Sequence, residues 1–204
     1  MATPTQPGAH ERIRAGLRET ARLLAELPDD QVARIAQTAD RMAKALKAGH
    51  KIIRFGNGGS ATQSQHMAAE FVGRFRRERA PLGSLSLAEN MASMTAIGND
   101  YAYEQVFSRQ LAALARPGDV AVGLSTSGNS PNVLRALREA KALQVATIGL
   151  TGGSGGQMAS LCDVCICVPS TVTAHIQEAH LAIGHLLCGL VEDDVSPPGQ
   201  PRTP

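Results

Sequence analysis

The stretch Lys51-Ile-Ile-Arg-Phe-Gly-Asn-Gly-Gly-Ser60 decides the fold of this chain. Its first half is a short apolar run that is typical of a buried strand. The glycines that follow permit positive φ angles and a close approach of the backbone to a ligand. A helix that starts directly after such a turn offers unpaired N–H groups to an anion. The pattern therefore predicts a strand, a glycine turn and a helix N-terminus, with an anion site where they meet.

Two titratable side chains follow in the same predicted helix. His66 and Glu70 are four residues apart, so they share one helix face. A surface ion pair is the ordinary explanation of this spacing. Because the helix begins in the predicted anion loop, the pair is also placed to act on a bound molecule. The combination indicates a phosphorylated substrate with acid–base or metal chemistry beside it.

Two further loops follow predicted strands. Leu124-Ser-Thr-Ser-Gly-Asn-Ser130 combines hydroxyl groups with backbone N–H groups, and Pro131 begins the next helix. It lacks the Gly-Lys-Ser/Thr ending of a P-loop, so it predicts a phosphate cradle without lysine, or else an ordinary capped turn. Thr151-Gly-Gly-Ser-Gly-Gly156 is a third glycine-rich turn. We interpret it as a connection rather than as a ligand loop.

Composition limits the classes of function. A chain of 204 residues is long enough to bury the core of one domain. A net charge of +2 and 3% aromatic residues give no strong field and few stacking groups, which argues against nucleic-acid and membrane partners. Residues 1–8 have no apolar h-region and no cleavage pattern, so we expect no targeting segment, and no apolar run is long enough to span a bilayer. We expect a cytoplasmic protein.

The cysteines are concentrated near the C-terminal part of the chain. Cys162, Cys165 and Cys167 fall close together in Leu-Cys-Asp-Val-Cys-Ile-Cys-Val168, and Cys188 stands apart. The C-x-x-C spacing has no second pair to complete a zinc site. We interpret these residues as small apolar side chains of a reduced protein, with a metal or redox site as the alternative.

The order of elements predicts an α/β fold. Residues 1–9 and 196–204 are predicted to be disordered, and residues 10–195 to form a single domain. Alternating strands and helices with continuous apolar strands predict a parallel sheet flanked by helices on both faces. The N-terminal helix pair could pack against another subunit. The predicted strands are 51–55, 84–87, 119–124, 145–150 and 164–168, and the predicted helices 10–27, 29–48, 60–73, 102–115, 131–143, 155–161 and 174–192.

The last predicted helix carries a cluster of polar residues. Gln177, Glu178 and His180 lie close together, and His185 follows. Histidines in a buried helix suit metal binding or proton transfer, although hydrogen-bonded core histidines are the ordinary explanation. The residues themselves leave both explanations open.

Six motifs in this order resemble the sugar isomerase (SIS) family, and within it the isomerases of seven-carbon sugar phosphates. The resemblance covers residues 10–192 and implies an SIS-type parallel sheet. It also implies an aldose–ketose isomerase that converts sedoheptulose 7-phosphate to D-glycero-D-manno-heptose 7-phosphate through an enediol, the first step toward nucleotide-activated heptoses. Family members are homotetramers, and we expect one zinc ion per subunit. The motifs are GNGGS, Gln-His-x-x-x-Glu, Val-Gly-Arg-Phe, Thr-Ala-Ile-Gly-Asn-Asp-Tyr, Ser-Thr-Ser-Gly-Asn-Ser-x-Asn-Val and Ile-Gln-Glu-x-His-x-x-x-x-His.

The resemblance also implies roles for single residues. Glu70 would be the general base and His185 the general acid. The zinc ligands would be His66, Glu70, Gln177 and His185. The substrate would be bound by Asn57, Gly58, Gly59, Ser60, Arg74, Asn99, Asp100, Ser125, Thr126, Ser127, Ser130 and Gln177.

Helix geometry conflicts with one part of this ligand set. Gln177 and His185 are eight residues apart, or about 12 Å along a straight helix. They can share an ion only if the helix is irregular or if they come from different subunits. His180 is the easier partner of Gln177 within one chain, so the sequence leaves His180 and His185 as alternative ligands.

Two departures from the family pattern affect the functional expectation. This chain has Gln63 where the family usually carries an acid, and Asn90 where it often has Asp. The alternative function is a non-catalytic SIS-domain adaptor, similar to relatives that bind the bacterial replication initiator. Those relatives lack Glu and His at the positions of Glu70 and His185, so we favour the enzyme. A phosphosugar-sensing regulatory domain ranks last, because nothing here resembles a DNA-binding module.

Overall fold

The computed structural model describes residues 8–196. We predicted disorder for residues 1–9 and 196–204. Of these, residues 1–7 and 197–204 lie outside the described residues. Ala9, which falls in the first predicted segment, begins the first helix.

Five parallel strands form the central sheet, and their order across it is β2-β1-β3-β4-β5. All strands are short and mostly buried, as expected when helices cover both faces of a sheet. The predicted α/β class is therefore confirmed. The strands are β1 (Ile52–Gly56), β2 (Ser84–Ser86), β3 (Val120–Ser125), β4 (Ala146–Gly152) and β5 (Val164–Val168).

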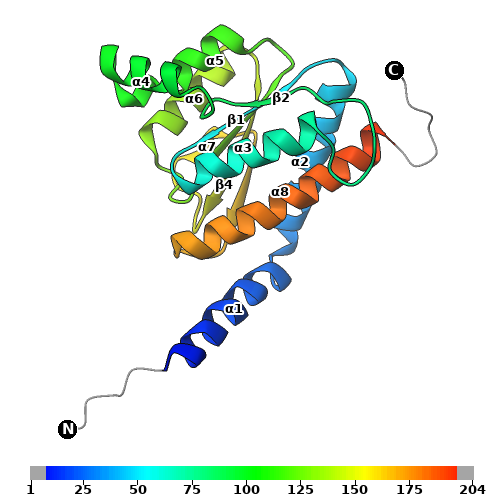
Figure 1. Ribbon diagram of the computed structural model, residues 1–204, viewed down its shortest axis with the longest axis vertical. Coiled ribbons are helices and arrows are strands. Elements are labelled where there is room, and N and C mark those ends of the chain that lie inside the picture. The colour runs from blue at the N-terminus through cyan, green and yellow to red at the C-terminus, as the bar shows by residue number, and fades with distance from the viewer. Residues whose placement is uncertain (1–7, 197–204) are drawn as a thin grey trace.

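The helices cover the sheet in two layers (Figure 1). One layer shares a hydrophobic core with the sheet and holds α2 (Asp29–Lys47), α3 (Gly59–Val72) and α8 (Thr173–Val195). The other covers the opposite face with α4 (Met91–Asp100), α5 (Ser108–Leu114), α6 (Pro131–Ala142) and α7 (Met158–Leu161). None of the described helices is long and apolar enough to cross a membrane.

The segment between β2 and β3 differs from our prediction. We expected one helix over 102–115, but a 3-10 turn (Tyr103–Gln105) precedes the shorter α5. The prediction also missed α4, which has no fully buried residue and so little apolar periodicity to reveal it. Asn90 caps this helix, because its side-chain oxygen accepts a hydrogen bond from the N–H of Ser93. Asn90, where the family often has Asp, therefore retains a side chain that can cap α4.

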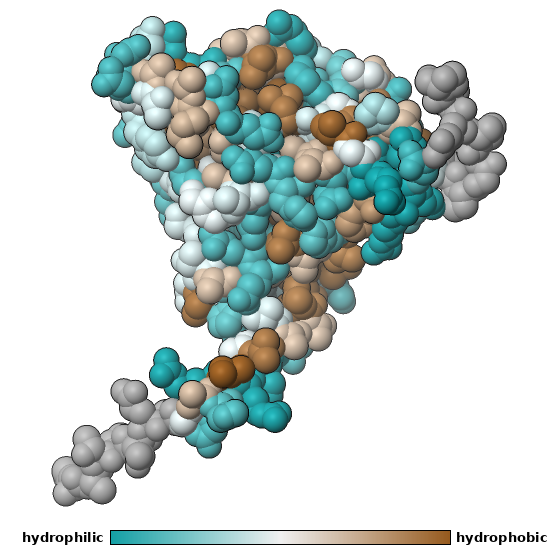
Figure 2. All heavy atoms as spheres, viewed as in Figure 1, coloured by the Kyte–Doolittle hydropathy of each residue, from teal (hydrophilic) through white to brown (hydrophobic). Residues whose placement is uncertain are grey.

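Helix α1 (Ala9–Ala25) extends away from the sheet (Figure 1). Periodicity predicts an apolar stripe of Ile13, Leu17, Leu24 and Leu27 on the first helix. Ile13, Leu17 and Leu24 are exposed, and Leu23 is the one buried residue of α1. Figure 2 shows apolar surface on this helix where it leaves the rest of the molecule. The apolar stripe predicted from the sequence therefore exists, but it has no partner within the described chain.

The sheet order places two of the sequence motifs side by side. Strands β1 and β3 are neighbours, and Gly56 at the end of β1 pairs with Leu124 near the end of β3. From β1 the chain continues to β2, on one side of this pair, and from β3 it continues to β4, on the other side. The two connections therefore diverge between β1 and β3. Ligands of open parallel sheets bind at such a point.

Candidate functional site

Three side chains from two helices form a compact group. The Nε2 atoms of His66 on α3 and His185 on α8 are 2.9 Å apart, and Glu70 Oε1 lies 3.5 Å from His66 Nε2. One donor atom from each residue lies within 4.8 Å of the other two. Two imidazoles and one carboxylate form a donor set found in catalytic zinc sites that keep an open position. The group can equally exchange protons with a bound molecule.

Close approach of α3 and α8 brings this group together. Gly184 precedes His185, and a Cβ atom there would overlap the side chain of Met67, at 2.6 Å from its Sδ. Met67 in turn follows His66 and is buried. The missing side chain at Gly184 therefore lets the helices approach until the two histidines meet.

The two histidines of α8 have different environments. His180 is fully buried, its Nε2 lies 3.1 Å from the carbonyl oxygen of Thr151, and its Nδ1 has no partner within residues 8–196. Burial lowers the pKa of His180 to about 4, although its hydrogen bond to the Thr151 carbonyl favours the charged form. His180 is thus neutral near pH 7 and donates to Thr151. Of the two alternatives that the sequence left open, the structure places His185 beside His66.

Gln177 does not join this group within one chain. A Cβ atom on Gly59 would lie 2.7 Å from its Nε2, so its side chain covers the start of α3. Helix α8 is continuous from Thr173 to Val195, which leaves Gln177 about 12 Å along the axis from His185. A shared ion would therefore need Gln177 from a second chain.

Gln63 joins the same two helices. Its Nε2 donates a hydrogen bond of 2.6 Å to the backbone oxygen of Gln177, and its Oε1 is buried without a partner in the described residues. An ionised acid at this position has no proton to donate to a carbonyl. Glutamine, where the family usually carries an acid, is therefore needed for this hydrogen bond between the two helices.

The hydroxyl loop after β3 is ordered by its own side chains. Ser125 Oγ lies 2.9 Å from Ser130 Oγ and 3.5 Å from Ser127 Oγ. Ser127 is exposed, Thr126 is half-buried, and Ser60 on the neighbouring loop is buried. Hydroxyl groups grouped at the N-terminus of α6 suit a phosphate. The structure thus brings together the two loops for which the sequence predicted anion binding.

Paired amides connect these two loops. Asn57 and Asn132 exchange two side-chain hydrogen bonds of 2.8 Å each, and Tyr103 Oη donates to Asn57 Oδ1 at 3.1 Å. The predicted substrate residue Asn57 therefore also joins β1 to α6. Sequence reasoning did not assign Asn132, although it stands in the Ser-x-Asn-Val motif.

The remaining predicted substrate residues lie in three places. Gly58 caps the N-terminus of α3 with a φ of 54° and leaves open space beside it. Arg74 is exposed in the turn after α3. Asn99 and Asp100 are exposed at the end of α4, where Asn99 Nδ2 donates to Asp100 Oδ1 at 2.8 Å. The structure shows no contact of these last three residues with the His66–Glu70–His185 group.

The third glycine-rich turn supports the hydroxyl loop. The N–H of Gly152 donates to the oxygen of Thr126 at 3.1 Å, and the N–H of Met158 donates to Gly128 at 3.1 Å. A Cβ atom on Gly156 would lie 2.6 Å from the backbone oxygen of Ser127. The turn is a connection, as predicted, but it also forms the wall on which the hydroxyl loop rests.

This contact gives a prediction with a matched control. Gly156 and Gly153 have φ angles of +53° and +57°, so alanine strains the backbone equally at both, but only at Gly156 does it press on Ser127. We expect Gly156→Ala to raise the KM for the phosphosugar about tenfold or more, while Gly153→Ala changes it less than about twofold. Steady-state kinetics of both variants measure this. Equal KM values would contradict a supporting role for Gly156.

A buried ion pair was missed by the sequence analysis. Arg79 Nε and Glu192 Oε1 are 3.1 Å apart, with side chains only 4% and 2% exposed. Glu192 is the first of three consecutive acids, Glu192-Asp193-Asp194, at the end of the last helix, so nothing in the sequence distinguished it from a surface acid. Because its partner lies 113 residues away in the chain, spacing alone could not identify the pair.

The cysteines behave as the apolar interpretation predicts. All four are free thiols; Cys165 and Cys167 lie in β5, and Cys188 is buried in α8. Hydrogen bonding with Cys162, together with burial, raises the pKa of Cys165 to about 12, and burial raises that of Cys188 to about 11. Thiols with a raised pKa are poor nucleophiles.

The fold and the site agree with known proteins. The SIS domain family model matches residues 17–152. The chain is 52% identical to a phosphoheptose isomerase of Rhodospirillum rubrum over 90% of this chain and 97% of that one. Solved phosphoheptose isomerases of Neisseria gonorrhoeae and Francisella tularensis are 40% and 34% identical, with a TM-score of 0.86 each. They cover 91% and 92% of this chain, and all of theirs.

These similarities identify the class of protein to which the chain belongs. The family-model match over residues 17–152, together with the five-stranded parallel sheet, shows that the chain is an SIS-domain protein. At the finer level, the chain belongs to the phosphoheptose isomerase family.

Proposed function

We propose that this protein converts sedoheptulose 7-phosphate to D-glycero-D-manno-heptose 7-phosphate. The observation that carries the proposal is the His66–Glu70–His185 group, which supplies a carboxylate and two imidazoles in a chain of this family. The hydroxyl loop and the glycine turn supply the place for the phosphate. The reaction is the first step toward nucleotide-activated heptoses.

The side chains divide the proton transfers between them. Glu70 removes a proton from C1 of the ketose, and the electron pair of that bond forms a double bond between C1 and C2. His185 gives a proton to the oxygen on C2, which completes an enediol. Glu70 then gives its proton to C2, and His185, now neutral, takes the proton of the C1 oxygen, which leaves the aldehyde of the aldose. Positioned acid and base groups typically contribute about 10²–10⁴-fold each.

Phosphate binding orients the reacting end of the sugar. Ser60, Ser125, Thr126, Ser127 and Ser130 would surround the phosphate, and Gly58 and Gly59 allow the backbone to approach it. Arg74, Asn99 and Asp100 remain proposed contacts of the sugar hydroxyls. Binding energy from a group remote from the reacting carbons holds those carbons beside Glu70.

The donor group also fits a divalent metal ion, and we propose zinc, one ion per subunit. His66, Glu70 and His185 would hold it, and Gln177 of a neighbouring chain would complete the set. Such an ion polarises a carbonyl and stabilises negative charge on its oxygen.

Metal content of two variants tests this ligand set. We expect His185→Ala to lose zinc, because His185 Nε2 faces His66 Nε2. We expect His180→Ala to keep zinc, because that side chain is buried and bonded to Thr151. Elemental analysis of the purified variants measures both. Loss of zinc in His180→Ala, with retention in His185→Ala, would show that the ligand assignment is wrong.

We also propose a homotetramer. The exposed Ile13 and Leu17 of α1 are 61% and 68% accessible, and a hollow of about 540 Å³ lies between α1 and His175 and Glu178 of α8. Burial of this stripe by another copy would remove apolar surface from water. Light scattering measures the mass in solution, and a fully active monomer would contradict the proposal.

Incubation with sedoheptulose 7-phosphate tests the function itself. We expect a heptose 7-phosphate to form. Because the ketose and the aldose are isomers of equal mass, chromatographic separation of the two detects the product. If no product forms with or without added zinc, the adaptor alternative is preferred. Retention of Glu70 and His185, and relatives of about 50% identity that are named phosphoheptose isomerase, argue for the enzyme.

A further inference from the structure

Few protein contacts orient the imidazole of His185. Its Nε2 faces His66, but within residues 8–196 its Nδ1 has no hydrogen-bond partner. A functional histidine is usually oriented by a hydrogen bond from its second ring nitrogen to a carboxylate or a carbonyl. His180 has such a bond to a carbonyl, and His185 does not. Within the protein, ring contacts therefore take the place of such a bond in setting the angle of the His185 ring.

Phe75 supplies one of these ring contacts. Its ring stacks on the His185 imidazole, with the centroids 5.8 Å apart and the planes at 21°, while His66 meets the same imidazole edge-on at 78°. Phe75 follows Arg74 in the Val-Gly-Arg-Phe motif, and the proposed chemistry assigns it no role. The His185 ring is thus placed by a stacked aromatic face and by the edge contact with His66.

The phenylalanine ring packs beside α8. Gly189 lies one turn beyond His185, and a Cβ atom there would be in ordinary van der Waals contact with Phe75 Cε1, at 3.5 Å. Phe75 is half-buried and packs against the core shared by α2, α3 and α8. Rotation of the ring away from His185 would give up this contact with the core.

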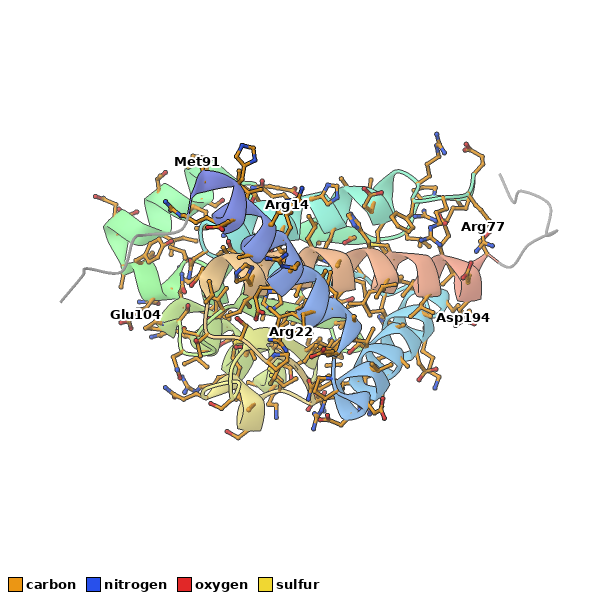
Figure 3. The ribbon with its side chains drawn as sticks, turned by 90° about the horizontal axis from the view of Figure 1, so that it is seen from below. Arg14, Arg22, Arg77, Met91, Glu104 and Asp194 are labelled. Atoms are coloured by element: carbon orange, nitrogen blue, oxygen red, sulfur yellow. The ribbon has the colours of Figure 1, made fainter. Side chains whose placement is uncertain are left out.

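The buried ion pair fixes the backbone of the same turn. Glu192 accepts hydrogen bonds from the N–H groups of Phe75, Arg76 and Arg77 at 3.2, 2.9 and 3.1 Å. Arg79 donates to the backbone oxygen of Glu70 at 2.8 Å and to that of Phe71 at 2.9 Å. Figure 3 shows Arg77, from this turn, at the end of α8 that carries Asp194. One turn is therefore attached both to the helix of Glu70 and to the helix of His185.

We propose that Phe75 is a positioning residue, which sets the orientation of the His185 ring toward Glu70 and the substrate. The Arg79–Glu192 pair holds the backbone from which Phe75 projects. The inference rests on the proposed isomerase function, since it concerns the geometry of the same acid. It predicts that a flat ring at position 75 is required for turnover and not for phosphate binding.

Two substitutions of Phe75 test the role of the ring. Phe75→Leu keeps apolar bulk but removes the flat face, and we expect kcat to fall about tenfold to 100-fold while the KM for the phosphosugar changes less than about twofold. Phe75→Tyr keeps the face and should retain kcat within about twofold. Leu82→Ala is the control for lost packing, because Leu82 is half-buried against the same core but does not contact His185. It should lower Tm with little change in kcat.

A spectroscopic measurement separates this inference from the proposed function. The Phe75 ring lies 5.8 Å from the His185 ring, centroid to centroid, so its ring current affects the His185 proton resonances. These resonances should shift in Phe75→Leu and stay in Phe75→Tyr. This result stands even if the protein has no isomerase activity. A kcat within twofold in Phe75→Leu, an equal loss in Phe75→Tyr, or unmoved His185 resonances in Phe75→Leu would overturn the proposal.

Discussion

Replacement of Glu70 by glutamine is expected to lower kcat by about 10²–10⁴-fold without unfolding the protein. An amide cannot remove the proton from C1, but it keeps the size and shape of the carboxylate. The Glu70 side chain is 22% exposed, and its contact with His66 is a solvent-accessible pair at 3.5 Å. Such pairs contribute at most about 1 kcal/mol to stability. The hydrogen bond from Arg79 involves the backbone oxygen of Glu70, so it survives the change.

Steady-state kinetics and thermal unfolding, measured on the same preparation, check this result. Asp40→Asn is a suitable control, because Asp40 also forms an i,i+4 pair, with Lys44 at 2.7 Å, on the exposed face of α2. The control should retain full turnover. Turnover of Glu70→Gln close to that of the wild type would exclude Glu70 as the base.

Replacement of Arg79 by methionine is expected to lower the free energy of unfolding by about 3–5 kcal/mol. The change leaves the carboxylate of Glu192 buried without its cation, although three backbone N–H groups still reach it. It also removes donors from the carbonyls at the end of α3, which have no partners within the helix. The first loss has the larger effect, because the Glu192 side chain is only 2% exposed and water can replace little of its lost contact.

Urea denaturation of Arg79→Met, Glu192→Leu and the double variant measures the coupling. The double variant should be more stable than the sum of the two single losses predicts, because no charge is then left unpaired. Arg22→Met is the surface control, since Arg22 is 50% exposed and pairs with Glu19 and Glu26 on α1. Its effect should stay within about 1 kcal/mol. An equal loss in Arg79→Met and Arg22→Met would contradict a stabilising role for the buried pair.

The strands and the loops after β1 and β3 could be predicted because their signals are local. A strand buried on both faces needs a continuous apolar run, and a turn that positions an anion needs glycines or hydroxyls directly after it. Helix α4 could not be predicted in this way. It packs only partly against the protein, so its residues carry no clear period of apolar positions.

The sequence by itself determined the sheet, the glycine and hydroxyl loops after two of its strands, and the shared helix face of His66 and Glu70. Tertiary structure decided that His185, 119 residues further on, completes this group, while His180 turns into the core. It also decided that the apolar stripe of α1 stays exposed, and that Arg79 meets Glu192. The physical reason is that periodicity records which face of an element is apolar, whereas the partner of that face depends on how closely two helices approach. Here that approach is set by Gly184, where the absence of a side chain admits Met67.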